Sequence, residues 1–197
     1  DVYKRQLSNF ENHATFNTIV ATDLMNNLAT VGLSSSSATG DTVFTGLKNI
    51  VTAEMRNGAG DVTLTYNSDV VTGTTDAQTV TVSNLTGGTL TAQGIETITV
   101  NTELVKSTVT DLVSSSLSKI VVTGTKDLTV TNGITANTVD ASAFTGALTV
   151  KAGVNAAQVI TGGAGNDVVD ANTNLGSGDT IKGGEGTDTL KVSLSAA

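Results

Sequence analysis

The sequence contains no proline, cysteine or tryptophan, and aromatic residues make up only 3% of it. Without cysteine the chain has neither disulfides nor thiol catalysis, although extracellular proteins often rely on a metal instead. So few aromatic rings would fill a globular core poorly, whereas a thin solenoid needs only small aliphatic side chains inside. The chain is instead rich in β-branched residues, with 36 threonines and 24 valines, and these favour strands. The composition therefore predicts an all-β solenoid.

Basic residues are also few. Ten Lys and Arg against 18 Asp and Glu give a formal net charge of −8, so no basic patch is present to bind nucleic acid. No run of 18 apolar residues occurs, and we expect no membrane span. The chain opens on the charged segment Asp1–Gln6, without Met or a signal peptide, and stops in mid-pattern. We interpret it as a piece of a longer protein, in which missing targeting signals mean little.

Motifs of catalysis are missing as well. The single histidine, His13, lies among small and polar residues, and the serine runs Ser34–Ser37 and Ser114–Ser116 are typical of solvated turns. No H-E-x-x-H, P-loop or G-x-S-x-G pattern is found. The carboxylates of Asp167 and Asp170 are better explained as a cation ligand and its solvated neighbour than as a glycosidase pair. We predict that this chain is not an enzyme.

Two nine-residue segments follow the pattern G-G-x-G-x-D-x-U-x, where U is a large aliphatic residue. The first runs from Gly162 to Asp170, and the second begins 21 residues later and runs from Gly183 to Lys191. Glycine allows tight turns with positive φ that aim carbonyl groups at one point. The aspartate adds a carboxylate there, and hard oxygen ligands suit Ca²⁺. The candidate metal-site residues are Gly162, Gly163, Gly165, Asp167, Gly183, Gly184, Gly186 and Asp188, together with Asp179 from a degenerate copy at 175–182.

This pattern resembles the nonapeptide of the RTX parallel β-roll. The resemblance implies that two nonapeptides make one coil and that a calcium ion lies between turns stacked on the same edge. The turns of Asp167 and Asp188 are then expected to face each other, with the Asp179 turn on the opposite edge. A second calcium at Asp179 would need a partner turn at Gly153–Asn155 or beyond Ala197. The alternative is a surface loop rich in Gly and Asp that binds no metal.

Aliphatic residues recur along the chain at the length of one coil. One series has intervals of 20, 19 and 21 residues, and an interleaved series has intervals of 18, 20 and 22; they are Val130, Val150, Val169 and Leu190, and Val121, Val139, Val159 and Ile181. Within a strand the alternation has period two, with Thr129 and Thr149 pointing outward. These spacings predict a right-handed parallel β-solenoid that grades into a short β-roll near residue 161.

Two segments have helical spacing of their aliphatic residues, and we expect short helices within 9–31 and 103–118. Both are rich in Asn, Thr and Ser, which are weak helix formers, and the first 30 residues have degenerate strands as an alternative. The sequence thus divides into an irregular or partly helical segment (1–46), a Thr/Val-rich β-solenoid (47–160) and a calcium-binding β-roll (161–197).

The stretch 139–150, followed by 159–167, resembles the β-strand-repeat region of RTX-type surface-layer proteins and large adhesins of Gram-negative bacteria. That resemblance implies type I secretion, calcium-dependent folding outside the cell and self-association into a surface lattice. Lipopolysaccharide or another cell-surface glycan would be bound through regions outside this chain. The leading hypothesis is a structural calcium-binding segment of a secreted surface-layer protein. The alternatives are the stalk of an RTX adhesin and the C-terminal calcium module of a secreted RTX protease or lipase.

Overall fold

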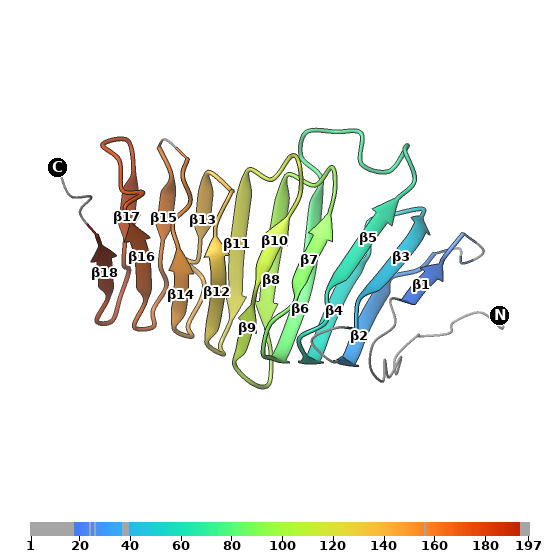
Figure 1. Cartoon of the computed structure of the whole chain (residues 1–197), viewed down its shortest axis with the longest axis horizontal. Coiled ribbons are helices and arrows are strands. Elements are labelled where there is room, and N and C mark those ends of the chain that lie inside the picture. The colour runs from blue at the N-terminus through green and yellow to red at the C-terminus, as the bar shows by residue number, and fades with distance from the viewer. Residues whose placement is uncertain (1–17, 24, 26, 37–39, 156, 194–197) are drawn as a thin grey trace.

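The computed structural model describes residues 18–23, 25, 27–36, 40–155 and 157–193. These described residues form eighteen strands and no helix. The strands lie in three sheets: one eight-stranded sheet extends along the long axis of the molecule, and two five-stranded sheets follow one another along the same axis (Figure 1). Every strand pairing is parallel, and the chain passes once through the eight-stranded sheet in each turn. The predicted all-β parallel β-solenoid is therefore confirmed, with about eight turns.

We call the eight-stranded sheet the long sheet; in spatial order it contains β17 (Thr180–Lys182), β15 (Val159–Thr161), β13 (Thr138–Asp140), β11 (Lys119–Gly124), β8 (Thr97–Thr102), β6 (Ala77–Leu85), β4 (Thr52–Gly58) and β2 (Thr30–Ser36). The N-terminal sheet contains β1 (Thr18–Ala21), β3 (Thr42–Leu47), β5 (Val62–Tyr66), β7 (Thr89–Ala92) and β10 (Asp111–Val113). The C-terminal sheet contains β18 (Thr189–Val192), β16 (Val168–Asn172), β14 (Leu148–Lys151), β12 (Leu128–Gly133) and β9 (Ser107–Val109).

The core is a column of aliphatic side chains between the sheets. Val130, Val150 and Val169 are buried on stacked strands of the C-terminal sheet. Thr129 and Thr149 alternate with them and are half-buried on the outer face. This alternation follows from the period-two pleat of a strand. The inward register predicted for this face is confirmed.

The second predicted series, which contains Val121 and Val159, is displaced by one residue from the inward-facing positions on two strands. Val121 pairs with Asp140 and Val159 pairs with Thr138, so both valines point outward. Val159 is 37% exposed, whereas its neighbour Ile160 is only 1% exposed. The stacked inward row is Ile120, Val139, Ile160 and Ile181. Where a strand has two consecutive aliphatic residues, the sequence alone does not decide which of the two points inward. A shift of one residue exchanges the inner and outer faces of the strand.

The predicted helices are not found among the described residues. Segment 103–118 contains β9 and β10, and segment 9–31 contains β1 and the start of β2, while residues 9–17 lie outside the described part. Strand β1 agrees with the alternative of degenerate strands, which covers the first 30 residues only. In both segments the Thr, Ser and Asn residues gain little in an isolated helix, whereas a neighbouring coil offers them backbone pairing. Strand β3 also runs across the predicted boundary at 46/47, and β15 runs across the one at 160/161.

Candidate metal site at the glycine-rich turns

The two nonapeptide turns lie on one edge of the solenoid, one coil apart. Each precedes a strand of the C-terminal sheet, and β16 pairs with β18 in a register that places Val168 beside Thr189. Asp167 and Asp188 therefore stack directly. Asp179 precedes β17 of the long sheet and lies on another edge, beside the turn that holds Gly153 and Ala157. This arrangement agrees with the one expected from the resemblance.

Glycine is required in these turns because neighbouring backbones approach closely. A Cβ added at Gly162 would overlap both the carbonyl oxygen of Gly183 and Oδ2 of Asp167. Gly184 has a φ of +104°, and a Cβ there would overlap the carbonyl oxygen of Gly163. Gly186 has a φ of +101°, a region that other residues rarely occupy. The two coils thus pack so closely that no side chain fits at Gly162 or Gly184.

The aspartate carboxylates are held by backbone amides. Asp167 is 2% exposed, and its Oδ1 accepts a hydrogen bond from Leu148 N (2.8 Å) while its Oδ2 accepts one from Gly163 N (2.6 Å). Asp188 is exposed, and its Oδ1 accepts a hydrogen bond from Asp167 N at 3.0 Å. Each of these bonds satisfies a backbone amide in a turn or at the start of a strand.

Asp179 makes the same kind of contact on its own edge. Its Oδ2 accepts a hydrogen bond from Gly176 N (2.8 Å), and its Oδ1 accepts one from Gln158 N (2.7 Å). These amides, with Gly176 the largest contributor, favour the ionised form and lower the pKa of Asp179 below its ordinary value. Asp179 is therefore a cap on its neighbouring coil.

Sequence reasoning missed the row of stacked polar residues to which Asp179 belongs. In all eight turns a polar residue lies one to three positions before the long-sheet strand; the row is Asn27, Asn49, Asp76, Glu96, Ser118, Asn137, Gln158 and Asp179. Gln158 is 2% exposed, and its Nε2 donates to the carbonyl oxygens of Ile134 and Ala136. The signal was present in the sequence as a polar residue once per coil, but it becomes visible only when the coils are aligned.

The donor set at the Asp167 and Asp188 turns fits a hard cation. Within the part of the chain that the structure describes, no three His, Cys, Asp or Glu side chains gather as a metal-ligand group. A cation at this edge would therefore take backbone carbonyl oxygens together with carboxylates, a mixture that Ca²⁺ accepts. Backbone carbonyls of the glycine turns and the exposed carboxylate of Asp188 would supply oxygens of both kinds. These donor types suit calcium.

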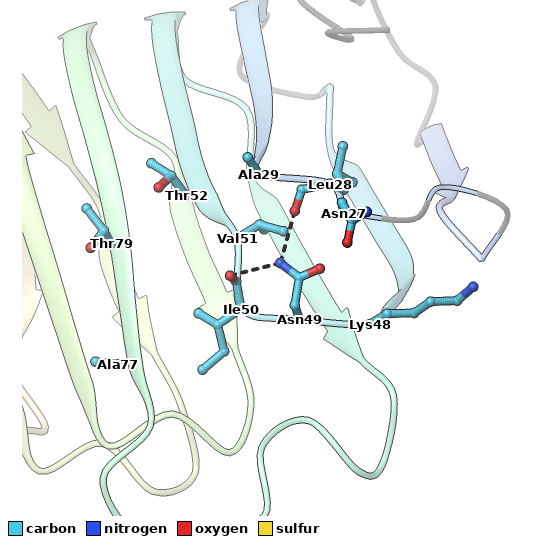
Figure 2. Close-up of a pocket in the computed structure, with 10 residues that line it drawn as sticks. All are labelled: Asn27, Leu28, Ala29, Lys48, Asn49, Ile50, Val51, Thr52, Ala77 and Thr79. Atoms are coloured by element: carbon cyan, nitrogen blue, oxygen red, sulfur yellow. Dashed lines mark hydrogen bonds between the residues drawn. The ribbon is translucent and has the colours of Figure 1, made fainter. Parts of the chain in front are cut away.

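A separate groove of 780 Å³ lies at the start of β2, β4 and β6 (Figure 2). The side chain of Asn49 lies in this groove, and its Nδ2 donates to the carbonyl oxygens of Leu28 (2.9 Å) and Ile50 (3.2 Å). The residues lining it are Asn27, Leu28, Ala29, Lys48, Asn49, Ile50, Val51, Thr52, Ala77 and Thr79. Among the described residues this lining includes no Asp, Glu or His.

Comparison with family models, with curated proteins and with solved structures finds no match to this chain. A search of the described residues for a helix long and apolar enough to cross a membrane also finds none. The chemistry of the turns is therefore the basis on which a function is proposed.

Proposed function

We propose that this chain is a calcium-binding structural segment of a secreted bacterial surface-layer protein. The observation that supports the proposal is the stacking of Asp167 and Asp188 one coil apart on a glycine-rich edge of a parallel β-solenoid. The resemblance of both turns to the RTX nonapeptide points to the same function. It also points to an extracellular location at the cell surface and to type I secretion.

The residues of this edge would bind calcium by combining backbone and side-chain oxygens. Asp188 contributes an exposed carboxylate, and the glycine-rich turns contribute carbonyl oxygens that no side chain shields. Bound calcium supplies the positive charge that neutralises carboxylates stacked at the spacing of one coil. The net charge of −8 keeps copies apart until a divalent ion screens it. Calcium would thus stabilise this edge and favour lateral self-association.

A calcium titration tests the binding step. Isothermal calorimetry of the chelator-treated chain should show saturable calcium binding, and Asp188→Ala should weaken it at least tenfold by removing a ligand. Asp170→Ala is the matched control, because Asp170 follows the turn and its Oδ1 accepts a local hydrogen bond from Asn172 N. Absence of calcium binding, or equal losses in both variants, would sink the metal assignment.

The state of the longer parent protein separates the surface-layer proposal from its alternatives. Light scattering and negative-stain microscopy should show ordered lateral assembly in millimolar Ca²⁺ and dispersal in chelator. A parent that stays monomeric while loaded with calcium would contradict the surface-layer role and favour an adhesin stalk. A zinc protease or lipase motif in the parent's own sequence would favour the enzyme module.

A further inference from the structure

Carboxylate and amide side chains connect neighbouring coils by hydrogen bonds at several places along the solenoid. In each case a side-chain oxygen accepts a hydrogen bond from a backbone N–H of the adjacent coil; the pairs are Asp41 with Asp61 (3.4 Å), Asp61 with Thr89 (2.7 Å), Asp127 with Ala147 (3.0 Å), Asn166 with Thr187 (2.8 Å), Asp179 with Gln158 (2.7 Å) and Asp188 with Asp167 (3.0 Å). All of these bonds join protein groups of two different coils.

Asp167 uses both of its oxygens, as Asp179 does, but differs from all of these residues because its side chain is buried. Leu148 N belongs to the preceding coil, and Gly163 N belongs to the turn of Asp167 itself. One carboxylate therefore ties the glycine-rich turn to the coil before it. Burial of a charge is costly unless hydrogen bonds replace its water, and charge-assisted bonds to amides are among the stronger ones.

We propose that Asp167 is a positioning residue, whose carboxylate locks the Gly162–Asp167 turn to the preceding coil whether or not a cation is bound. This inference rests on the proposed function only in placing the calcium site at the same turn. With the turn locked, the backbone N–H of Asp167 is presented to Asp188 Oδ1 and orients that carboxylate beside the carbonyl oxygens. Calcium then binds to a turn that is already folded.

The competing expectation is that Asp167 and Asp188 repel each other without calcium, so that everything from residue 161 onward unfolds in chelator. The structure directs the two carboxylates at different backbone amides, which supply partial positive charge to each. The two expectations differ at two atoms, the amide hydrogens of Leu148 and Gly163. Their exchange with solvent measures the lock directly.

Hydrogen exchange of the full chain in EDTA, followed by NMR, is the test. In the wild type the amides of Leu148 and Gly163 should exchange at least a hundredfold more slowly than in an unfolded chain. Asp167→Asn keeps one acceptor oxygen and replaces the other with an NH₂ donor, so protection of at least one of the two amides should fall tenfold or more. Asp170→Asn should leave both unchanged. Ile134 N, which donates to the carbonyl oxygen of Lys151, reports whether these coils remain folded.

Calcium binding to the same variant distinguishes positioning from ligation. Calorimetry of Asp167→Asn should show a weaker dissociation constant with the same number of ions bound. Unprotected Leu148 and Gly163 amides in the chelated wild type would overturn the lock. So would full protection of both amides in Asp167→Asn combined with loss of one bound ion, because Asp167 would then be a ligand alone. Protected amides in a chain that never binds calcium would support the lock and contradict the proposed function.

Discussion

Two pairs of coils share one strand register but differ in chemistry. One pair contains Leu128 and Leu148, and the other contains Asp167 and Asp188. The register pairs Leu128 with Leu148 and places Asp167 and Asp188 on the same row. Leu148 is 1% exposed and Asp167 is 2% exposed. An aliphatic side chain and a carboxylate thus occupy equivalent buried positions. The stacking of strands and turns sets the coil, and the inward position accepts either chemistry if its polar atoms find partners.

The partners of the carboxylate explain why the second pair of coils tolerates it. Asp167 has two amide donors at its edge position, whereas Val150 and Val169 lie further along the strands among apolar side chains. The nonapeptide therefore changes the composition of one edge and leaves the core beyond it apolar. A carboxylate placed elsewhere in the same coil would lack this support.

The largest expected effect comes from moving a carboxylate away from those amides. Val150→Asp would place a charge at a position that is 1% exposed within the apolar core. It should lower the free energy of unfolding by on the order of 4 kcal/mol and unfold neighbouring coils. Urea denaturation followed by circular dichroism measures the loss. Thr149→Asp, on the outer face of the same strand, should change the stability by less than about 1 kcal/mol. Equal effects would contradict the inward register.

The next effect concerns the close approach of stacked glycine turns. Gly162→Ala should destabilise the C-terminal coils by roughly 3 kcal/mol, because its Cβ would overlap the backbone carbonyl of Gly183 as well as Asp167 Oδ2. Gly133→Ala is the matched control, since the nearest atom to its Cβ would be Ala152 O at 3.5 Å, an ordinary contact. Thermal unfolding of both variants decides the point, and a stable Gly162→Ala would show that the turns are looser than described.

A smaller effect, of opposite sign, is expected where the N-terminal and C-terminal sheets meet. Leu104 has a φ of +55° and is 74% exposed, whereas Asn57 and Asn84 hold positive φ at the same register of earlier coils. Left-handed backbone costs an ordinary residue roughly 1 kcal/mol, and asparagine tolerates it better. Leu104→Asn should therefore raise the free energy of unfolding by about 0.5–1 kcal/mol. Val105→Asn should not, and equal urea midpoints for wild type and Leu104→Asn would argue against strain at this turn.

The smallest expected effect is a pH-dependent one on the outer face of the long sheet. Lys119 Nζ lies 2.9 Å from Asp140 Oδ2, and its hydrogen bond, aided by Ser142, lowers the pKa of Asp140 below its ordinary value. A lowered pKa stabilises the fold above the unfolded-state pKa, and this stability is lost as pH falls through the folded-state value. The two side chains are 39% and 34% exposed, so screening limits the contribution to roughly 0.5 kcal/mol.

Asp140→Asn should show that loss at pH 7, and the difference from the wild type should vanish in acid. Urea titrations at several pH values and at two salt concentrations measure it. A difference that persists at the lowest pH, or that ignores salt, would mean that the carboxylate acts through packing and not through its charge.

The sequence by itself determined the class of the fold and the chemistry of one edge. Alternation of Thr with Val at coil-length intervals predicts parallel stacked strands, and the resemblance of the nonapeptides to the RTX repeat implies two turns on one edge. These signals are local, because strand alternation and turn chemistry depend on the residues in one coil. The inward row of Val130, Val150 and Val169 could be read correctly for the same reason.

Only the tertiary structure decided which face a run such as Ile120–Val122 presents, because two adjacent aliphatic residues satisfy either register until a neighbouring strand fixes one. It also decided that segment 103–118 forms strands, since coil-to-coil pairing outweighs a weak helical pattern. The partners of Asp167 lie at Gly163, within its own turn, and at Leu148, 19 residues away in another coil. Such a bond exists only once the coils are stacked, because the amide and the carboxylate meet through the coil length and not through their neighbours in sequence.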